Sequence, residues 1–260
     1  MYKSAKNALN IITLTSALFI ANVASATIIN GTGDITPDVI FGSGNANGSW
    51  SGEHNVNLGI EVGLRAKLRY DATGSPQNIF NYDGDRTYTF DPTLSVIPAG
   101  RSVFNFEYAV NVDTDGSGDV LSDYTYLFEF DLDPTAGVVF SPFSGDIITL
   151  KTDNSLGNNS TGKGGGTVDV ANYASLLGSN NVAQNSLNRG FGFSGLLDPA
   201  ANGIFTYNLS VLDQAGALIA SSSIDVVVGP TAVSAPGATL LFALGLAGMF
   251  VRRVSKRLPN

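Results

Sequence analysis

The sequence has no cysteine, a single histidine and few charged residues. Its 260 residues include 14 Lys and Arg, 22 Asp and Glu, and one His. The lack of cysteine excludes disulfides, thiolate nucleophiles, Cys-ligated zinc and iron–sulfur clusters, and one histidine excludes a multi-histidine metal site. Hydrophobic residues form 43% of the chain and aromatic residues 10%, which is enough for a packed core without cross-links.

The positive charges are concentrated at the two ends of the chain. Lys3 and Lys6 lie near the start, and the last nine residues include four basic ones, whereas every acid lies between Asp34 and Asp225. Between the ends, eight basic residues face 22 acidic ones, a net charge of −14. We expect no nucleic-acid partner, because binding to phosphates needs a positive patch.

Residues 1–26 have the pattern of a secretory signal peptide. Two lysines precede a mostly apolar stretch, and the small residues Ala24-Ser25-Ala26 follow it as a cleavage site. The apolar stretch is short and contains Asn, Thr and Ser, which favours cleavage over anchoring in the membrane. We predict that signal peptidase cuts after Ala26 and that the mature chain, beginning at Thr27, is exported.

Residues 230–260 form a second targeting pattern. Residues 238–251 carry no charge, and a basic cluster that begins with Arg252 and Arg253 follows them directly. An apolar helix of this length rises about 21 Å, short of a ~30 Å hydrocarbon core, although the uncharged residues before it can extend it. Because basic residues stay on the cytoplasmic side, the pattern predicts a membrane helix that leaves residues 27–229 outside.

This tail resembles the PEP-CTERM sorting signal of Gram-negative bacteria. That signal has a Val-Pro-Glu-Pro-like motif, a short transmembrane helix and an arginine-rich end. Val233 and Pro236 match the motif, with Ser-Ala in place of its Pro-Glu, and Arg252 and Arg253 match the basic end. The resemblance implies that an exosortase-type transpeptidase removes the tail and that the protein reaches the cell surface or an extracellular polysaccharide matrix. The alternative is that the tail stays as an anchor.

Residues 27–229 alternate between apolar and polar side chains with the period of β-strands. The longest such row is Ile60–Tyr70. Similar rows are Phe104–Val112, Tyr124–Leu132, Phe205–Val211 and Leu218–Val228, and shorter ones are Thr87–Phe90, Val138–Phe140, Ile147–Lys151 and Gly190–Phe193. We expect an all-β body, a two-sheet antiparallel β-sandwich of immunoglobulin-like or jelly-roll type, with one face of each sheet in water. Val170–Leu177 is the one short helix expected.

An aspartate-rich motif joins the second and third rows. Calcium loops of the EF-hand type take ligands from positions 1, 3, 5 and 7 and place a glycine at position 6. Asp113, Asp115, Ser117 and Asp119 fill these positions, but Tyr124 stands where the bidentate glutamate is required. Because Gly and Asp also favour turns, two interpretations stay open, a Ca²⁺ site that stabilises a hairpin and a solvated turn without metal.

We expect a noncatalytic exported protein with a structural or adhesive role. The first alternative is a carbohydrate-binding module with a calcium-stabilised hairpin, in which a sugar stacks on Trp50, Tyr70, Tyr82 and Tyr88. The second is a jelly-roll glycoside hydrolase that uses Glu129, Asp131 and Asp133 on one strand with Glu107 on its neighbour, since retaining glycosidases hold two carboxyl groups about 5.5 Å apart. A solvated outer face explains these carboxylates better, because exposed charges are ordinary on alternating strands, so we predict no enzymatic activity.

Overall fold

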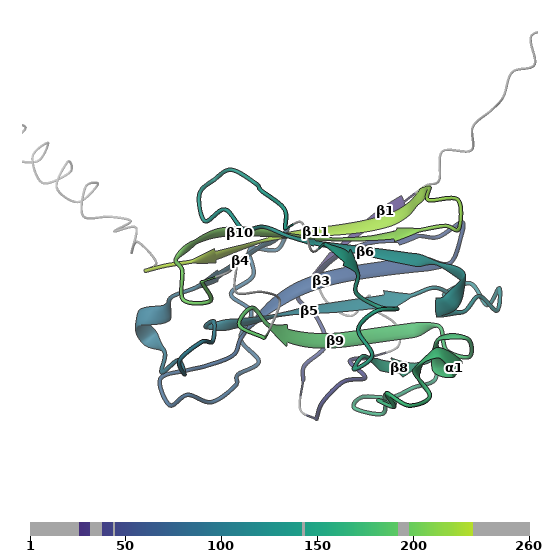
Figure 1. Ribbon diagram of the computed structural model, residues 1–260, viewed down its shortest axis with the longest axis horizontal. Helices are drawn as coiled ribbons and strands as arrows, with labels where there is room; N and C mark the ends of the chain where they lie inside the picture. Colours follow the sequence, from purple (N-terminus) through teal and green to yellow (C-terminus); the bar gives the residue numbers. More distant parts are fainter. Residues whose placement is uncertain (1–25, 32–37, 44, 142–143, 192–197, 231–260) are drawn as a thin grey trace, which may run out of the picture.

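The computed structural model describes residues 26–31, 38–43, 45–141, 144–191 and 198–230 (Figure 1). The expected signal peptide up to Ser25, the apolar segment 238–251, and Val233, Pro236, Arg252 and Arg253 lie outside these residues. Among the residues that are described, no helix has the length and apolar character needed to cross a membrane.

The described chain is mostly β and forms two sheets. Sheet A has the strand order β1 (Ala26–Gly31), β2 (Trp50–Asn55), β3 (Ile60–Leu68), β5 (Phe104–Asn111), β9 (Val182–Asn188) and β8 (Ser155–Gly157). Sheet B has the order β4 (Thr87–Phe90), β11 (Leu218–Val228), β10 (Gly203–Leu212), β6 (Thr125–Phe130) and β7 (Gly145–Asp146). The helical turns are η1 (Pro92–Leu94), η2 (Leu121–Asp123) and α1 (Tyr173–Leu177).

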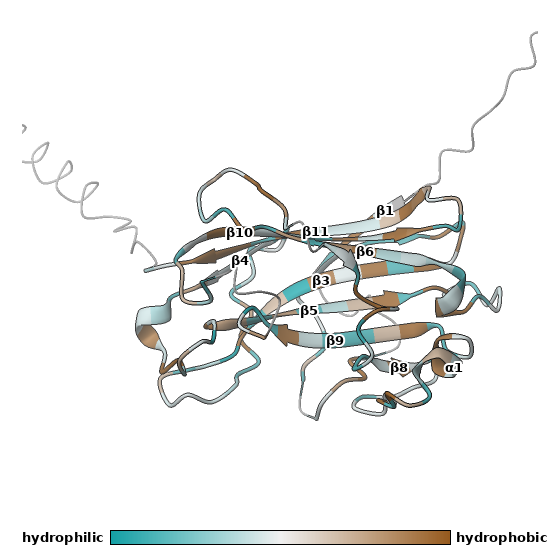
Figure 2. Ribbon diagram, viewed as in Figure 1, coloured by the Kyte–Doolittle hydropathy of each residue, from teal (hydrophilic) through white to brown (hydrophobic). Residues whose placement is uncertain are grey.

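The two sheets enclose one hydrophobic core. Hydrophobic and hydrophilic residues follow one another along β3 and β5 (Figure 2), because successive side chains of a strand point to opposite faces. The inward side chains of both sheets belong to a single cluster of buried residues. At its centre the Phe106 ring of sheet A stacks on Phe128 and Tyr207 of sheet B, with ring centroids 5.2 and 5.0 Å apart. The core therefore holds the two sheets together without covalent links.

The five long rows of alternating residues are strands, as predicted. They correspond to β3, β5, β6, β10 and β11, and the short row Thr87–Phe90 is β4. The expected helix forms over its second half as α1, Tyr173–Leu177. The prediction of purely antiparallel pairing is wrong at one place, because β4 runs parallel to β11.

The other short rows are not strands. Val138–Phe140 contributes an isolated bridge between Phe140 and Asp131, and residues 147–150 form a turn directly after β7. Gly190 and Phe191 belong to the turn that follows β9, and the next residues of that row lie outside the described part. The polar strand β9 itself had no alternating pattern to reveal it.

The central strands β3 and β5 of sheet A are buried on both faces, contrary to the expectation of one face in water. All eight residues of β5 are buried. The outer face of these strands is covered by residues 38–43 and 45–49, where Val39 and Phe41 pack together with Trp50 of β2 and Ala109 of β5. The described part of this covering segment, residues 38–43 and 45–49, is rich in Gly, Asn and Ser. Its composition therefore gave no sign that it packs on a sheet.

Candidate functional site

A cluster of charged side chains lies on the outer face of sheet A. Arg65 of β3 stands opposite Glu107 of β5 in the strand register. The Arg65 Nη2 and Nε atoms each lie 2.6 Å from Glu107 Oε2, and the Lys67 Nζ lies 3.0 Å from Glu107 Oε1. The Arg65 and Glu107 side chains have no exposed surface. We call these three residues the ionic cluster.

The covering segment encloses the ionic cluster. Arg65 Nη1 donates to the carbonyl oxygens of Ala46 and Gly48, at 2.9 and 2.7 Å. The Arg65 guanidinium carbon lies 4.2 Å from the Trp50 ring centroid and 4.7 Å from that of Phe80. Hydrogen bonds and aromatic rings thus replace the water that the charge loses on burial. The cluster fastens the covering segment to the sheet.

The charges of the cluster decide the protonation of Glu107. Burial by itself would raise the pKa of the Glu107 carboxyl, because a buried carboxylate loses its hydration. The neighbouring cations Arg65 and Lys67 outweigh burial and hold this pKa below its ordinary value. Glu107 is therefore ionised in the folded protein near neutral pH.

The predicted set of four carboxylates does not form. Glu107 belongs to sheet A, whereas Glu129 lies on β6 of sheet B, so the expectation that they occupy neighbouring strands is wrong. Asp131 is 1% exposed, and its Oδ1 accepts from the backbone N–H groups of Asp133 and Val139. This carboxylate holds the turn after β6 in shape. The chain crosses from one sheet to the other between β5 and β6, which the assumption of a hairpin missed.

The aspartate-rich motif forms a compact turn at this crossing. Asp113 Oδ1 accepts from the Gly118 N–H at 3.0 Å and from the Ser117 hydroxyl at 3.2 Å. Asp115 Oδ1 accepts from the Ser117 N–H at 3.1 Å. The Asp119 carboxylate turns away and accepts from the Tyr124 hydroxyl at 2.8 Å. Asp113, Asp115 and Ser117 thus share one turn, while the side chain of Asp119 is directed elsewhere.

The geometry of the aspartate-rich turn can be compared with that of a calcium site. Within the described ranges, no group of three or more His, Asp or Glu side chains is arranged to hold a metal ion. The hydrogen bonds to Asp113 and Asp115 are those of an Asx-type turn that needs no cation. The residues as they stand do not fit a closed calcium shell, and Ca²⁺ binding stays a prediction for titration.

The aromatic platform expected for sugar stacking lies mostly inside the protein. Trp50, Tyr70 and Tyr88 are 2%, 7% and 0% exposed. Tyr82 is half-buried and stacks on Tyr88 with ring centroids 4.8 Å apart. These rings therefore support the fold, and a sugar cannot reach the faces of the three buried ones.

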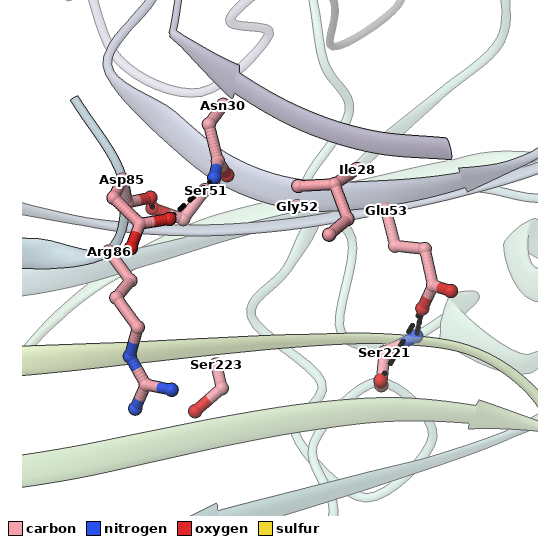
Figure 3. A pocket seen from close by; sticks show the side chains of 9 residues that line it. All are labelled: Ile28, Asn30, Ser51, Gly52, Glu53, Asp85, Arg86, Ser221 and Ser223. Atoms are coloured by element: carbon pink, nitrogen blue, oxygen red, sulfur yellow. Dashed lines mark hydrogen bonds between the residues drawn. The ribbon is translucent and has the colours of Figure 1, made fainter. Parts of the chain in front are cut away.

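A polar groove opens where β1 and β2 of sheet A meet the exposed edge of β11 (Figure 3). Its volume is about 320 Å³. The lining residues include two carboxylates, one guanidinium, one amide and three hydroxyls; they are Ile28, Asn30, Ser51, Gly52, Glu53, Asp85, Arg86, Ser221 and Ser223. Sequence reasoning missed this groove, because its residues come from four separate segments and none forms a motif.

The groove exists because β4 is shorter than β11. Strand β4 pairs with β11 only over Asp225–Val228, so the first part of β11 has no strand on that side. On that side, two side chains of β2 form hydrogen bonds with the backbone of β11 instead. Glu53 Oε2 accepts from the Ser221 N–H at 2.6 Å, and Asn55 Nδ2 donates to the Ile219 carbonyl at 3.0 Å. Ser223 lines the groove between these bonds and β4.

The charges around the groove are partly paired. Arg86 Nη2 lies 3.0 Å from each Asp225 carboxylate oxygen, and Asn30 Nδ2 donates to Asp85 Oδ1 at 3.0 Å. Both hydrogen bonds of the Glu53 carboxylate to Ser221 use the same oxygen, Oε2. A ligand rich in hydroxyl groups matches this set of donors and acceptors, because each hydroxyl both donates and accepts.

We predict that Glu107→Gln destabilises the protein by about 3–5 kcal/mol, because Arg65 and Lys67 would stay buried without an anion. The ordinary pKa of this carboxyl is 4.5, and its pKa in the folded state is lower. As the pH falls from about 4.5 through the folded-state pKa, the unfolded chain binds a proton more readily than the folded chain, so the wild-type protein should lose stability over this range. The variant should lack this part of the pH dependence. Urea unfolding at several pH values measures both effects. Glu129→Gln, on the outer face of sheet B, is the control and should cost little.

We predict that Asp113→Ala lowers the free energy of unfolding by about 1–2 kcal/mol, because it removes the acceptor shared by Ser117 and Gly118. We expect the same loss in excess calcium and in excess chelator. Asp213→Ala is the matched control, since Asp213 Oδ1 also accepts from two backbone N–H groups in a turn. A loss at Asp113 that appears only with calcium would instead establish the Ca²⁺ interpretation.

Comparison of the chain with family models, with curated proteins and with solved structures found no match. The groove, the aspartate-rich turn and the ionic cluster are therefore interpreted from their own geometry. Of the three, the groove and the turn are open to solvent, and the ionic cluster is buried.

Proposed function

We propose that the chain is a noncatalytic exported protein with a structural or adhesive role at the cell surface or in an extracellular polysaccharide matrix. Signal peptidase removes residues 1–26, and the tail first holds the protein in the inner membrane. An exosortase-type transpeptidase then recognises the PEP-CTERM-like signal and releases the body. We infer that the body is a β-sandwich of immunoglobulin-like or jelly-roll type.

The observation that carries this proposal is the order of features in the tail. Val233 and Pro236 precede the uncharged residues 238–251, and Arg252 and Arg253 come next. The body itself ends in regular structure directly before this tail, because β11 ends at Val228 and the Gly229 N–H bonds to the Phe90 carbonyl at 3.0 Å. A β-body joined by a short linker to a membrane segment suits display at a surface.

The interior of the body supports a structural role. Its core contains stacked aromatic rings, and the buried cations Arg65 and Lys67 are both paired with the Glu107 carboxylate in the ionic cluster. A protein that must persist outside the cell without disulfides has to derive its stability from such packing. The acidic net charge keeps an exported body soluble.

Mass spectrometry of the protein released from the cell surface tests the processing steps. We expect a mature chain that begins at Thr27 and lacks Arg252 and Arg253. Replacing Val233 and Pro236 together by alanine should leave the tail in place and the protein in the inner membrane, whereas replacing Thr231 and Ser234 should not. A surface form that still carries both arginines would rule out sorting by cleavage.

Glycan binding is a second candidate, and the groove is the observation that favours it. Ser223→Trp should fill the groove and abolish binding to any glycan that an array of the wild-type protein identifies. Thr125→Trp, an exposed position on β6 outside the groove, is the control and should bind normally. Equal binding by both variants, or no binding by the wild type, would remove this candidate.

A further inference from the structure

The side-chain nitrogen of Lys67 lies between an amide and a carboxylate on the outer face of sheet A. Lys67 is buried on β3, and its Nζ donates a hydrogen bond to Asn45 Oδ1 in the covering segment. The same Nζ lies 3.0 Å from Glu107 Oε1 of the ionic cluster. A buried amino group is thus held against the side-chain carbonyl of an asparagine, with a carboxylate beside it.

The amide of Asn45 is fixed at both of its ends. Its Nδ2 donates to the Phe41 carbonyl at 3.0 Å, while its Oδ1 accepts from Lys67. Because an ammonium group only donates and a carbonyl oxygen only accepts, these two bonds define which end of the amide faces Lys67. The fold thus holds an amine next to the carbonyl group of an amide. Reacting groups that are well oriented in this way behave as if their concentration were about 10⁵–10⁸ M.

The ionic cluster contains more positive than negative charge. Arg65 and Lys67 both pair with the single carboxylate of Glu107. Ser186 also donates to Glu107 Oε1, at 2.9 Å, but it brings no charge. A buried charge without a counter-ion of its own is costly, because it has lost its hydration. Loss of the charge on Lys67 would leave one guanidinium paired with one carboxylate.

We propose that Lys67 and Asn45 form an isopeptide bond, an amide that joins their side chains. Glu107 Oε1 takes one proton from the Lys67 ammonium group, and the lone pair freed on Nζ forms a bond to the Asn45 side-chain carbon. The π electrons of the carbonyl move onto Oδ1. Glu107 then gives its proton to Nδ2, and the bond from the carbon to Nδ2 breaks as the carbonyl re-forms. The second proton from Nζ leaves with the departing nitrogen, so the by-product is ammonium.

This reaction needs no oxidant or cofactor and occurs once in each molecule, so it does not have to be fast. The ammonium carries the excess charge of the cluster into water, where it is diluted, and this favours the product. The bond joins the covering segment to β3 covalently. Exported proteins often use disulfides for this purpose, and this chain has no cysteine. The bond goes beyond the proposed export and sorting and depends on neither.

Tryptic digestion of the denatured full chain, followed by mass spectrometry, tests the bond. Trypsin cuts after Arg65 and Lys67 in an unlinked chain. An amide at Nζ removes the charge that trypsin recognises at Lys67. We therefore expect a branched product in which residues 66–69 are attached to Asn45, in the peptide that ends at Arg65. It should weigh one ammonia less than its two parts and should account for most of the wild-type material.

Three variants separate this bond from other losses of ammonia. Lys67→Arg keeps the cation and Asn45→Ala removes the amide, and neither should give the branched product. Asn47→Ala is the matched control and should still give it. Asn47 lies in the same segment before a glycine, where an asparagine side chain can lose ammonia to its own backbone. That reaction would leave Lys67 open to trypsin.

A fourth variant tests the role of the carboxylate. Glu107→Asp keeps the charge of the cluster but draws the carboxylate back from Nζ. In samples taken at intervals after synthesis, it should form the branched product more slowly than the wild type, and an equal rate would overturn the assigned proton transfer. Separate peptides from the wild-type protein after prolonged incubation at neutral pH would overturn the bond itself. The terminal peptides of the same digest report signal and tail processing, so failure of one proposal is distinguished from failure of the other.

Discussion

The burial of one carboxylate determines how sheet A is built. Glu107 lies on the outer face of the sheet, where an antiparallel sheet would ordinarily meet water, and it is fully buried there. An ionised carboxylate without water needs compensating charge and hydrogen bonds, which Arg65 and Lys67 supply. Arg65 in turn needs acceptors, and it finds them in the covering segment. The buried charges of the ionic cluster thus depend on residues 38–43 and 45–49, which lie over the sheet.

The covering segment in turn depends on β9. Gln184 accepts from the Ile40 N–H at 2.8 Å and donates to the Asp38 carbonyl at 3.0 Å. Backbone bonds from Gly164 to Val39 and from Gly166 to Ile40 fasten the same segment on its other side. Polar residues in a strand therefore have a structural task, because they satisfy the backbone of a segment that has no strand of its own.

Much of the fold could be predicted from the sequence, since period-two alternation identifies strands with one side in the core. It identified β3, β5, β6, β10 and β11, which carry the aromatic core. It failed for β2 and β9, whose buried side chains include Ser51, Asn55, Gln184 and Asn188, because a hydrophobic pattern cannot signal a buried residue that is polar. It also placed Glu107 beside Glu129, because two adjacent rows joined by a turn motif suggest a hairpin. The intervening η2 helix carries the chain to the other sheet.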